Sequence, residues 1–265
     1  MKNPIWWVTL ILAMAGIAAI LYYHYSPKPE PQPQPQTPAP AAIKPEPETK
    51  PVPKIQYPVA EPEEVKPLPA LGESDAAMKE ALTGLIGQKT FAEFFYLDRI
   101  IRRIVATVDN LPREKAAQRL MPLKPVAGKF LVTGEEDNLV LNPANYARYE
   151  PYVRLAEALN VKQLVAVYVH FYPLFQKAYR DLGYPTGYFN DRLVEVIDHL
   201  IAAPDVQGPV KLVQPSLMYQ FADRELQTRS AGQKIMIRMG TENAARIKAK
   251  LKEYRRELTG QELKQ

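Results

Sequence analysis

Three stretches follow one another along the chain, distinguished by how apolar and polar residues alternate. Residues 5–23 begin with Ile5, end with Tyr23 and contain no charged side chain. This run is close to the ~20 apolar residues that cross a hydrocarbon core as a helix. Proline then dominates residues 27–69, and from about residue 70 apolar side chains recur at helical spacing. The pattern predicts a short cytoplasmic N-terminus (1–4), a transmembrane signal anchor (5–25), a linker (26–69), one folded domain (70–259) and a flexible tail (260–265).

The charges around the apolar run predict the orientation of the anchor. Lys2 and the amino terminus precede the run, whereas on its far side Lys28 is soon followed by Glu30. Because basic residues favour the cytoplasmic side, we expect a single-pass protein of the bacterial inner membrane with a periplasmic domain. The alternative is a cleaved signal peptide, with small residues such as Ala15 and Ala19 at its end. The apolar run continues past both sites and exceeds the ~7 to 15 residues of such a segment, which favours the uncleaved anchor.

Alternating prolines predict a disordered, extended linker. Proline fixes φ and has no amide donor, so residues 27–69 favour polyproline II over helix or sheet. At ~3.1 Å per residue, about forty residues reach on the order of 100 Å. The simplest interpretation is a passive tether that holds the domain away from the bilayer.

Apolar spacing after residue 70 predicts a mainly helical domain. The strongest amphipathic pattern spans residues 91–108, where Asp98 and Arg102 have the i, i+4 spacing of an ion pair. Residues 164–175 are apolar on nearly every side, which predicts the buried core helix, and Pro173 should kink or divide that helix. Further helices are expected near residues 75–86, 113–120, 143–159, 190–203, 230–239 and 241–258.

One small β-hairpin is predicted within the helical domain. The apolar runs 130–132 and 139–141 flank a turn that contains Gly134 and polar residues. Residues 210–213 are compatible with a further short strand. The predicted fold class is therefore mainly α: a single helical domain with one small β-hairpin, preceded by one transmembrane helix and a disordered proline-rich linker.

The chain contains no cysteine. This excludes a disulfide, a thiolate metal site and a cysteine nucleophile. A domain of this size can bury a sufficient core without cross-links, so the composition is compatible with an oxidising compartment.

Several phrases carry a resemblance to a known family. They are Leu-Pro-Ala-Leu with Ser-Asp (68–71 and 74–75), Val-Asp-Asn-Leu-Pro (108–112), Tyr-Val-His-Phe-Tyr-Pro-Leu-Phe (168–175), Gly-Tyr-Phe-Asn-Asp-Arg-Leu (187–193) and Arg-Met-Gly-Thr-Glu-Asn-Ala (238–244). With these phrases the chain resembles the bacterial domain of unknown function 3014 family over residues 68–258. The resemblance implies a membrane-anchored protein of Gram-negative bacteria without an assigned activity, and it transfers no catalytic residue.

Aromatic residues are concentrated between residues 146 and 189. Tyrosine combines an apolar ring with a hydroxyl, which suits a groove for sugars or peptides. The alternative is a core built from large rings whose hydroxyls reach the surface. The candidate ligand-binding residues are Tyr168, Tyr172, Tyr184, Tyr188, Phe189 and Arg192.

Carboxylates offer a second, catalytic hypothesis. A cell-wall hydrolase would need one acid to protonate the leaving group and a second to activate water or attack. Each candidate also has a structural explanation, such as an ion pair or a position at a helix end. The weak catalytic candidates are Asp98, Asp109, Glu157, Asp191 and Glu195.

The sequence gives little support for a metal site, and it contains no glycine-rich phosphate-binding loop. His170 and His199 are the histidines beyond the predicted membrane anchor (5–25), and Glu195 precedes His199 by one helical turn, but the His-Glu-x-x-His spacing is missing. We therefore expect no metal and no cofactor.

Basic residues outnumber acidic ones from Arg224 onward, which suits anionic envelope polymers or lipid head groups, or simply a solvated helix face. The expected compartment disfavours nucleic acid as a partner.

These patterns predict a single-pass inner-membrane protein whose helical periplasmic domain binds an envelope protein or a cell-wall component such as peptidoglycan. One alternative is an envelope hydrolase that uses paired carboxylates. Another is a structural subunit of an envelope complex. None of these hypotheses implies a particular oligomeric state.

Overall fold

The computed structural model describes residues 54–59, 67–135 and 138–261. The predicted N-terminus, the transmembrane anchor and most of the linker lie outside these residues. Within the described ranges, no helix has both the length and the hydrophobicity needed to cross a membrane.

The described part of the chain is mainly helical, which confirms the predicted class. The helices are η1 (Leu71–Glu73), α2 (Asp75–Ile86), α3 (Gln88–Phe94), α4 (Ile100–Asn110), η2 (Gln118–Leu120), α5 (Ala144–Ala158), α6 (Val161–Asp181), α7 (Phe189–Ile201), α8 (Arg224–Thr228), α9 (Ala231–Arg238) and α10 (Thr241–Thr259). The strands are β1 (Val132–Thr133), β2 (Leu139–Leu141), β3 (Lys211–Val213) and β4 (Gln220–Phe221).

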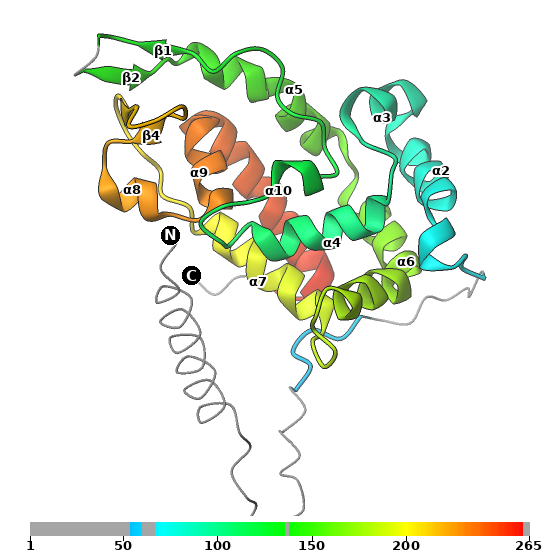
Figure 1. Cartoon of the computed structure of the whole chain (residues 1–265). Coiled ribbons are helices and arrows are strands. Elements are labelled where there is room, and N and C mark those ends of the chain that lie inside the picture. Colours follow the sequence, from blue (N-terminus) through cyan, green and yellow to red (C-terminus); the bar gives the residue numbers. More distant parts are fainter. Residues whose placement is uncertain (1–53, 60–66, 136–137, 262–265) are drawn as a thin grey trace, which may run out of the picture. The chain divides into compact units, whose positions relative to one another are not determined.

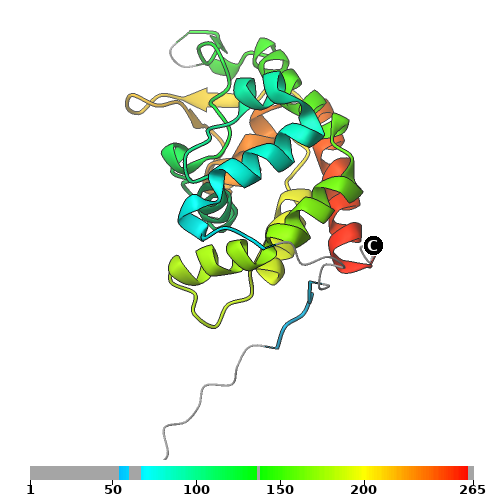
Figure 2. The same cartoon turned by 90° about the vertical axis from the view of Figure 1, so that its right-hand side faces the viewer.

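Helices α4, α6 and α7 form the centre of the domain. The apolar face of α4 buries Ile101 and Val105 in one cluster with Phe171 and Phe175 of α6 and Phe189 of α7. Figure 1 shows α4 and α7 crossing the middle of the molecule, with α2, α3 and α6 to one side. Helix α10 packs against α5 and α7 and forms the red edge of the side view in Figure 2. These contacts place the first turn of α7 at a junction of several helices.

The predicted hairpin is present and forms half of a larger sheet. Strands β1 and β2 pair antiparallel, and the sheet continues in the order β1-β2-β3-β4. Leu139 of β2 lies opposite Leu212 of β3, which is far along the chain. A second core cluster beneath the sheet includes Leu141, Leu212 and Phe221. The prediction of one small β-hairpin is therefore corrected to a four-stranded antiparallel sheet, in which β3 coincides with the short strand expected near residues 210–213.

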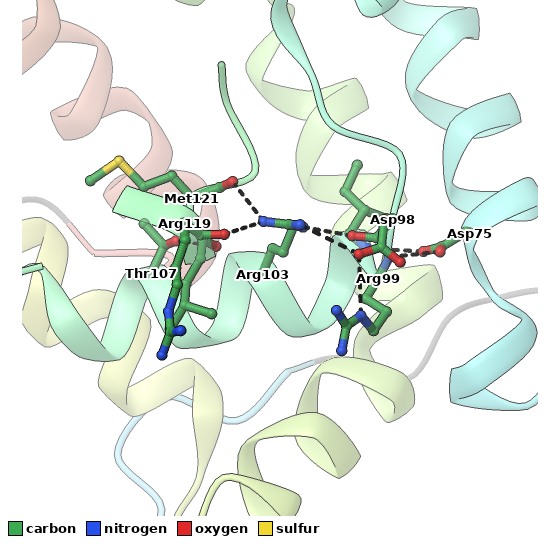
Figure 3. Close-up of polar contacts among 9 residues, drawn as sticks. Asp75, Asp98, Arg99, Arg103, Thr107, Arg119 and Met121 are labelled. Atoms are coloured by element: carbon green, nitrogen blue, oxygen red, sulfur yellow. Dashed lines mark hydrogen bonds and ion pairs between the residues drawn. The ribbon is translucent and has the colours of Figure 1, made fainter. Parts of the chain in front are cut away.

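The single helix predicted over residues 91–108 is wrong, because the chain breaks between α3 and α4. Arg99 adopts a left-handed backbone conformation with φ of 51°. The carboxylate of Asp75, on another helix, accepts the backbone amides of Arg99 at 2.7 Å and Ile100 at 2.9 Å (Figure 3). This tertiary contact supplies the acceptors that the first amides of α4 lack within their own helix.

The ion pair predicted between Asp98 and Arg102 is also wrong. Asp98 instead pairs with Arg99 at 3.3 Å and with Arg103 at 3.4 Å, as Figure 3 shows. Arg102 pairs with Asp181 of α6 at 2.9 Å. The break before α4 changes the positions that share a face, so the spacing deduced for one long helix no longer applies.

Helix α6 continues through Pro173 without interruption, so the predicted division of this helix at Pro173 is wrong. Pro173 is exposed, as are Gln163 and Ala166. The helix is therefore amphipathic and not buried on every side. The hydrogen bond that proline removes falls on the solvent side, where water can replace it. Residues 113–120 contain only the short η2 instead of the predicted helix.

Candidate functional site

A short segment of the predicted linker is bound at the N-terminus of α7. We call this segment, residues 54–59, the strap; it is the blue segment below α7 in Figure 1. The backbone amides of Gln56 and Tyr57 donate to the two carboxylate oxygens of Asp191, at 3.0 and 2.8 Å. The amide of Val59 donates to the hydroxyl of Tyr188 at 2.9 Å. The first turn of α7 thus holds the strap through its backbone.

Asn190 completes the contact and is itself held in place from within the domain. Its side chain is fully buried, and its Nδ2 donates to the carbonyl oxygen of Tyr57 at 2.8 Å. The hydroxyl of Tyr168 donates to Oδ1 of Asn190 at 3.0 Å. Because the amide oxygen is already used by Tyr168, the amide nitrogen is directed to the strap.

A buried glutamine fixes the turn that leads into this site. Gln176 of α6 accepts the backbone amide of Phe189 and the hydroxyl of Tyr172 on its Oε1, both at 2.9 Å. Its Nε2 donates to the carbonyl oxygen of Gly187 at 2.8 Å. The residues on both sides of Tyr188 are therefore held by one side chain, which positions the Tyr188 hydroxyl for the strap.

The rings of three tyrosines pack against one another beside the strap site. The ring of Tyr172 lies 5.6 Å from the rings of both Tyr168 and Tyr188. Burial raises the pKa of the Tyr168 hydroxyl well above its ordinary value, and it also raises the pKa of Tyr172. Both phenols remain protonated at neutral pH and serve as hydrogen-bond donors.

Strap side chains alternate between the domain and solvent. Tyr57 and Val59 are half-buried, whereas Gln56 and Pro58 are exposed. Arg255 of α10 lies close to Tyr57: the pKa of Arg255 is raised chiefly by its hydrogen bond to Asp198, with a smaller contribution from Tyr57. Pro58, which has no amide, occupies the position between two residues whose amides are bound.

The predicted ligand-binding residues divide between two places. Tyr168, Tyr172 and Tyr188 lie together at the strap, and Phe189 is a core residue with 1% of its surface exposed. Tyr184 and Arg192 belong to a separate ionic cluster around Asp109. The aromatic concentration therefore builds both the core and one wall of the strap site.

Asp109 lies at the centre of that ionic cluster, with only 4% of its side chain exposed. Its carboxylate is bound by Arg113 at 2.6 Å, by Arg192 at 3.3 Å and by the hydroxyl of Tyr184 at 3.2 Å. Arg192 also pairs with Glu195 at 2.9 Å. One guanidinium thus lies between two catalytic candidates, and its ion pair with Asp109 links α7 to α4.

The other carboxylate candidates lie apart. Asp98 is at the exposed start of α4, and Glu157 of α5 pairs with Arg246 of α10 at 2.6 Å. Asp191 binds the strap amides. Only Asp109 and Glu195 are brought together, and a shared arginine separates them.

His199 forms a hydrogen bond with Ser230, the N-cap residue of α9. The distance from Nε2 to Oγ is 2.7 Å, and burial lowers the pKa of His199. The amides of Ala231 and Gly232, next to this serine, donate to the carbonyl oxygens of Arg113 and Leu111, which follow the end of α4. They are therefore engaged in packing and do not point at a substrate site. His170 lies against the ring of Phe171, and in the described part of the chain no three His, Cys, Asp or Glu side chains gather around a common point.

Several basic residues of the C-terminal helix bind acids from other elements. Arg246 pairs with Glu150 at 2.8 Å as well as with Glu157, and Arg255 pairs with Asp198 at 2.5 Å. These pairs fasten α10 to α5 and α7. These two arginines are therefore paired with acids of other helices, and Arg255 is buried.

The sequence interpretation missed the strap, together with Asn190 and Gln176. The strap lies inside the stretch predicted to be a disordered linker. One signal could have found it, since Tyr57 is the only aromatic residue in residues 26–66. Asn190 and Gln176 carried no pattern that distinguishes a binding residue from a polar helix position.

Comparison with known proteins gives one match. The family model described as "Protein of unknown function (DUF3014)" matches residues 100–255. The matched region contains Tyr168, Gln176, Tyr188, Asn190 and Asp191, and the strap lies before it. No curated protein and no solved structure matches the chain.

Proposed function

We infer that this chain, which belongs to the family described as protein of unknown function (DUF3014), is a tethered binding module whose helical domain binds polypeptide at the first turn of α7. The observation that carries this proposal is the bound strap. Asp191, Asn190 and Tyr188 together satisfy three amides and one carbonyl group of a segment that is neither helix nor strand.

The chemistry of the site favours a protein partner over a glycan. All four groups held at the strap are peptide backbone groups, and two of them are successive amides that donate to one carboxylate. We therefore propose that the partner is an envelope protein with an exposed, unpaired segment. Recognition through the main chain gives affinity.

We also propose the setting in which this module acts. Residues 5–23 anchor the chain in the inner membrane with the N-terminus in the cytoplasm, and the proline-rich residues carry the domain into the periplasm. A reporter fused to the C-terminus tests this topology. Activity of a periplasm-specific reporter is the expected result, and activity of a cytoplasm-specific reporter alone would contradict it.

The binding proposal is tested by crosslinking in membranes followed by purification of the full chain. We expect an envelope protein to be crosslinked to the wild type and to be reduced at least about tenfold in Asp191→Ala, because the two amide acceptors are lost. Asp98→Ala removes an exposed carboxylate away from the strap and should leave the crosslink unchanged.

The hydrolase alternative predicts a different result in the same preparation. Purified full chain would then release soluble fragments from peptidoglycan, and Asp109→Asn or Glu195→Gln would abolish the release. If that activity is observed while only the bait itself is recovered after crosslinking, the binding proposal is wrong.

A further inference from the structure

The strap shows which kind of segment this site accepts. We propose that the α7 site recognises peptides in which an aromatic residue is followed by proline and then by an apolar residue, and that the strap occupies the site as a built-in competitor. This inference rests on the proposed polypeptide-binding function and adds to it the class of ligand and a mode of regulation.

The backbone contacts explain why proline is accepted at one position only. The amides of Gln56, Tyr57 and Val59 are each bound, so a proline at any of these positions would remove a hydrogen bond. Position 58 is occupied by proline, which has no amide, and the three hydrogen bonds of its neighbours form with proline in place. Proline also restricts the free peptide, which lowers the entropy that binding must remove.

Backbone contacts alone do not select the strap from the rest of the linker. Other prolines, such as Pro45 and Pro51, also follow two residues with amides and precede a residue that is not proline. Within residues 27–69, however, only Pro58 follows an aromatic residue. Because Tyr57 and Val59 are the half-buried side chains of the strap, we assign the selection to these two positions.

Occupancy of the site by the strap excludes a second segment. Both oxygens of Asp191, the Nδ2 of Asn190 and the hydroxyl of Tyr188 are engaged by the strap. A partner peptide must therefore displace it. Since the strap is part of the same chain, its effective concentration at the α7 site is on the order of millimolar. It therefore competes with a partner peptide although no free strap peptide is added.

The experiment measures binding of a fluorescent synthetic peptide with the sequence of residues 53–60 to the purified full chain. The strap variant carries Tyr57→Ala and Val59→Ala. The matched control carries Ile43→Ala and Val52→Ala, which change apolar linker residues outside the strap. We expect the strap variant to bind the peptide at least about tenfold more tightly than the wild type, and the control to behave as the wild type.

Changes in the peptide itself test the register without altering the fold of the chain. With the strap variant as host, Pro58→Ala in the peptide should weaken binding only about two- to fivefold, because the free peptide becomes less restricted, whereas Gln56→Pro or Tyr57→Ala should weaken it at least about tenfold. Adding Asp191→Ala to the host should also weaken binding of the unmodified peptide. If the peptide binds no host, or binds equally with and without Asp191, the inference is overturned.

The result is distinguishable from failure of the proposed function. If the envelope protein is still crosslinked in an Asp191-dependent manner and the peptide does not compete, the ligand class is wrong and the binding function stands. If neither the peptide nor an envelope protein depends on Asp191, both proposals are wrong.

Discussion

The side chain of Asn190 donates a hydrogen bond to the carbonyl oxygen of Tyr57 at 2.8 Å, across 133 positions of the chain. It therefore joins the first turn of α7 to a segment that the proline pattern assigned to the tether. A similar arrangement occurs within the domain, where Asp75 accepts two successive amides at the start of α4. Asp191, next to Asn190, likewise accepts two successive amides of the strap, so in both places a single carboxylate holds backbone that has no partner in its own element.

The strap should be protected from hydrogen exchange. The amides of Gln56, Tyr57 and Val59 are hydrogen-bonded, so residues 54–59 should exchange at least about tenfold more slowly than an unstructured peptide of the same sequence. Hydrogen–deuterium exchange with mass spectrometry on the full chain measures this. Asp191→Ala should abolish the protection and Asp98→Ala should retain it; exchange at the unstructured rate in the wild type would contradict the strap contact.

Replacement of Asp75 should destabilise the domain by about 1 kcal/mol, the typical value of a side-chain cap. Asp75→Ala leaves the amides of Arg99 and Ile100 without their acceptors at the break before α4. Urea unfolding of the full chain measures the change in free energy. Asp98→Ala removes only exposed ion pairs and should cost less than about 0.5 kcal/mol. Equal effects of the two variants would show that the Asp75 contact does not support α4.

His199 should make the stability depend on pH in mildly acidic solution. Burial lowers its pKa below the ordinary value of 6.5, so the unfolded chain binds more protons than the folded chain as the pH falls. The contribution of neutral His199 to the free energy of unfolding is fully present above pH 6.5. It is lost as the pH falls through the lowered pKa that His199 has in the folded chain. His199→Gln retains a partner for Ser230 but does not titrate, and its urea midpoint should fall less between pH 7.5 and pH 5 than that of the wild type. Identical pH profiles would contradict the prediction.

Two glycines should respond to alanine in opposite directions. Gly240 has φ of 83°, and an added Cβ would lie 2.7 Å from the ring of Tyr146, so Gly240→Ala should destabilise by about 2 kcal/mol. Gly84 lies within α2 with open space around it, and Gly84→Ala should stabilise by about 0.5 to 1 kcal/mol. Urea unfolding of both variants provides the comparison. Destabilisation of similar size at both positions would contradict this interpretation.

Local patterns predicted the elements whose partners are close in sequence. Amphipathic spacing identified the helices now seen as α5 and α7, because a helix repeats its buried face within a few residues, and a continuous apolar run identified α6. The hairpin of β1 and β2 was predictable for the same reason, since its turn joins two adjacent apolar runs. Strand β4 has only two residues, which is too short for a recognisable alternation.

The candidate site was predictable in part. The density of aromatic residues identified Tyr168, Tyr172 and Tyr188 as a group, and the structure brings them together. Asp191 was singled out as a candidate acid, but its role is set by the strap amides, which come from a distant part of the chain. No local pattern encodes a contact over such a separation.

The amino-acid sequence by itself determined the helical class, the hairpin and the alternation of buried and exposed faces, because these depend on side chains a few positions apart. Only the tertiary structure decided where the helix predicted over residues 91–108 breaks, how two hairpins join into one sheet, and which segment lies on α7. Each of these depends on a hydrogen bond or packing contact between distant residues. Such contacts form only when the chain has already brought their partners together.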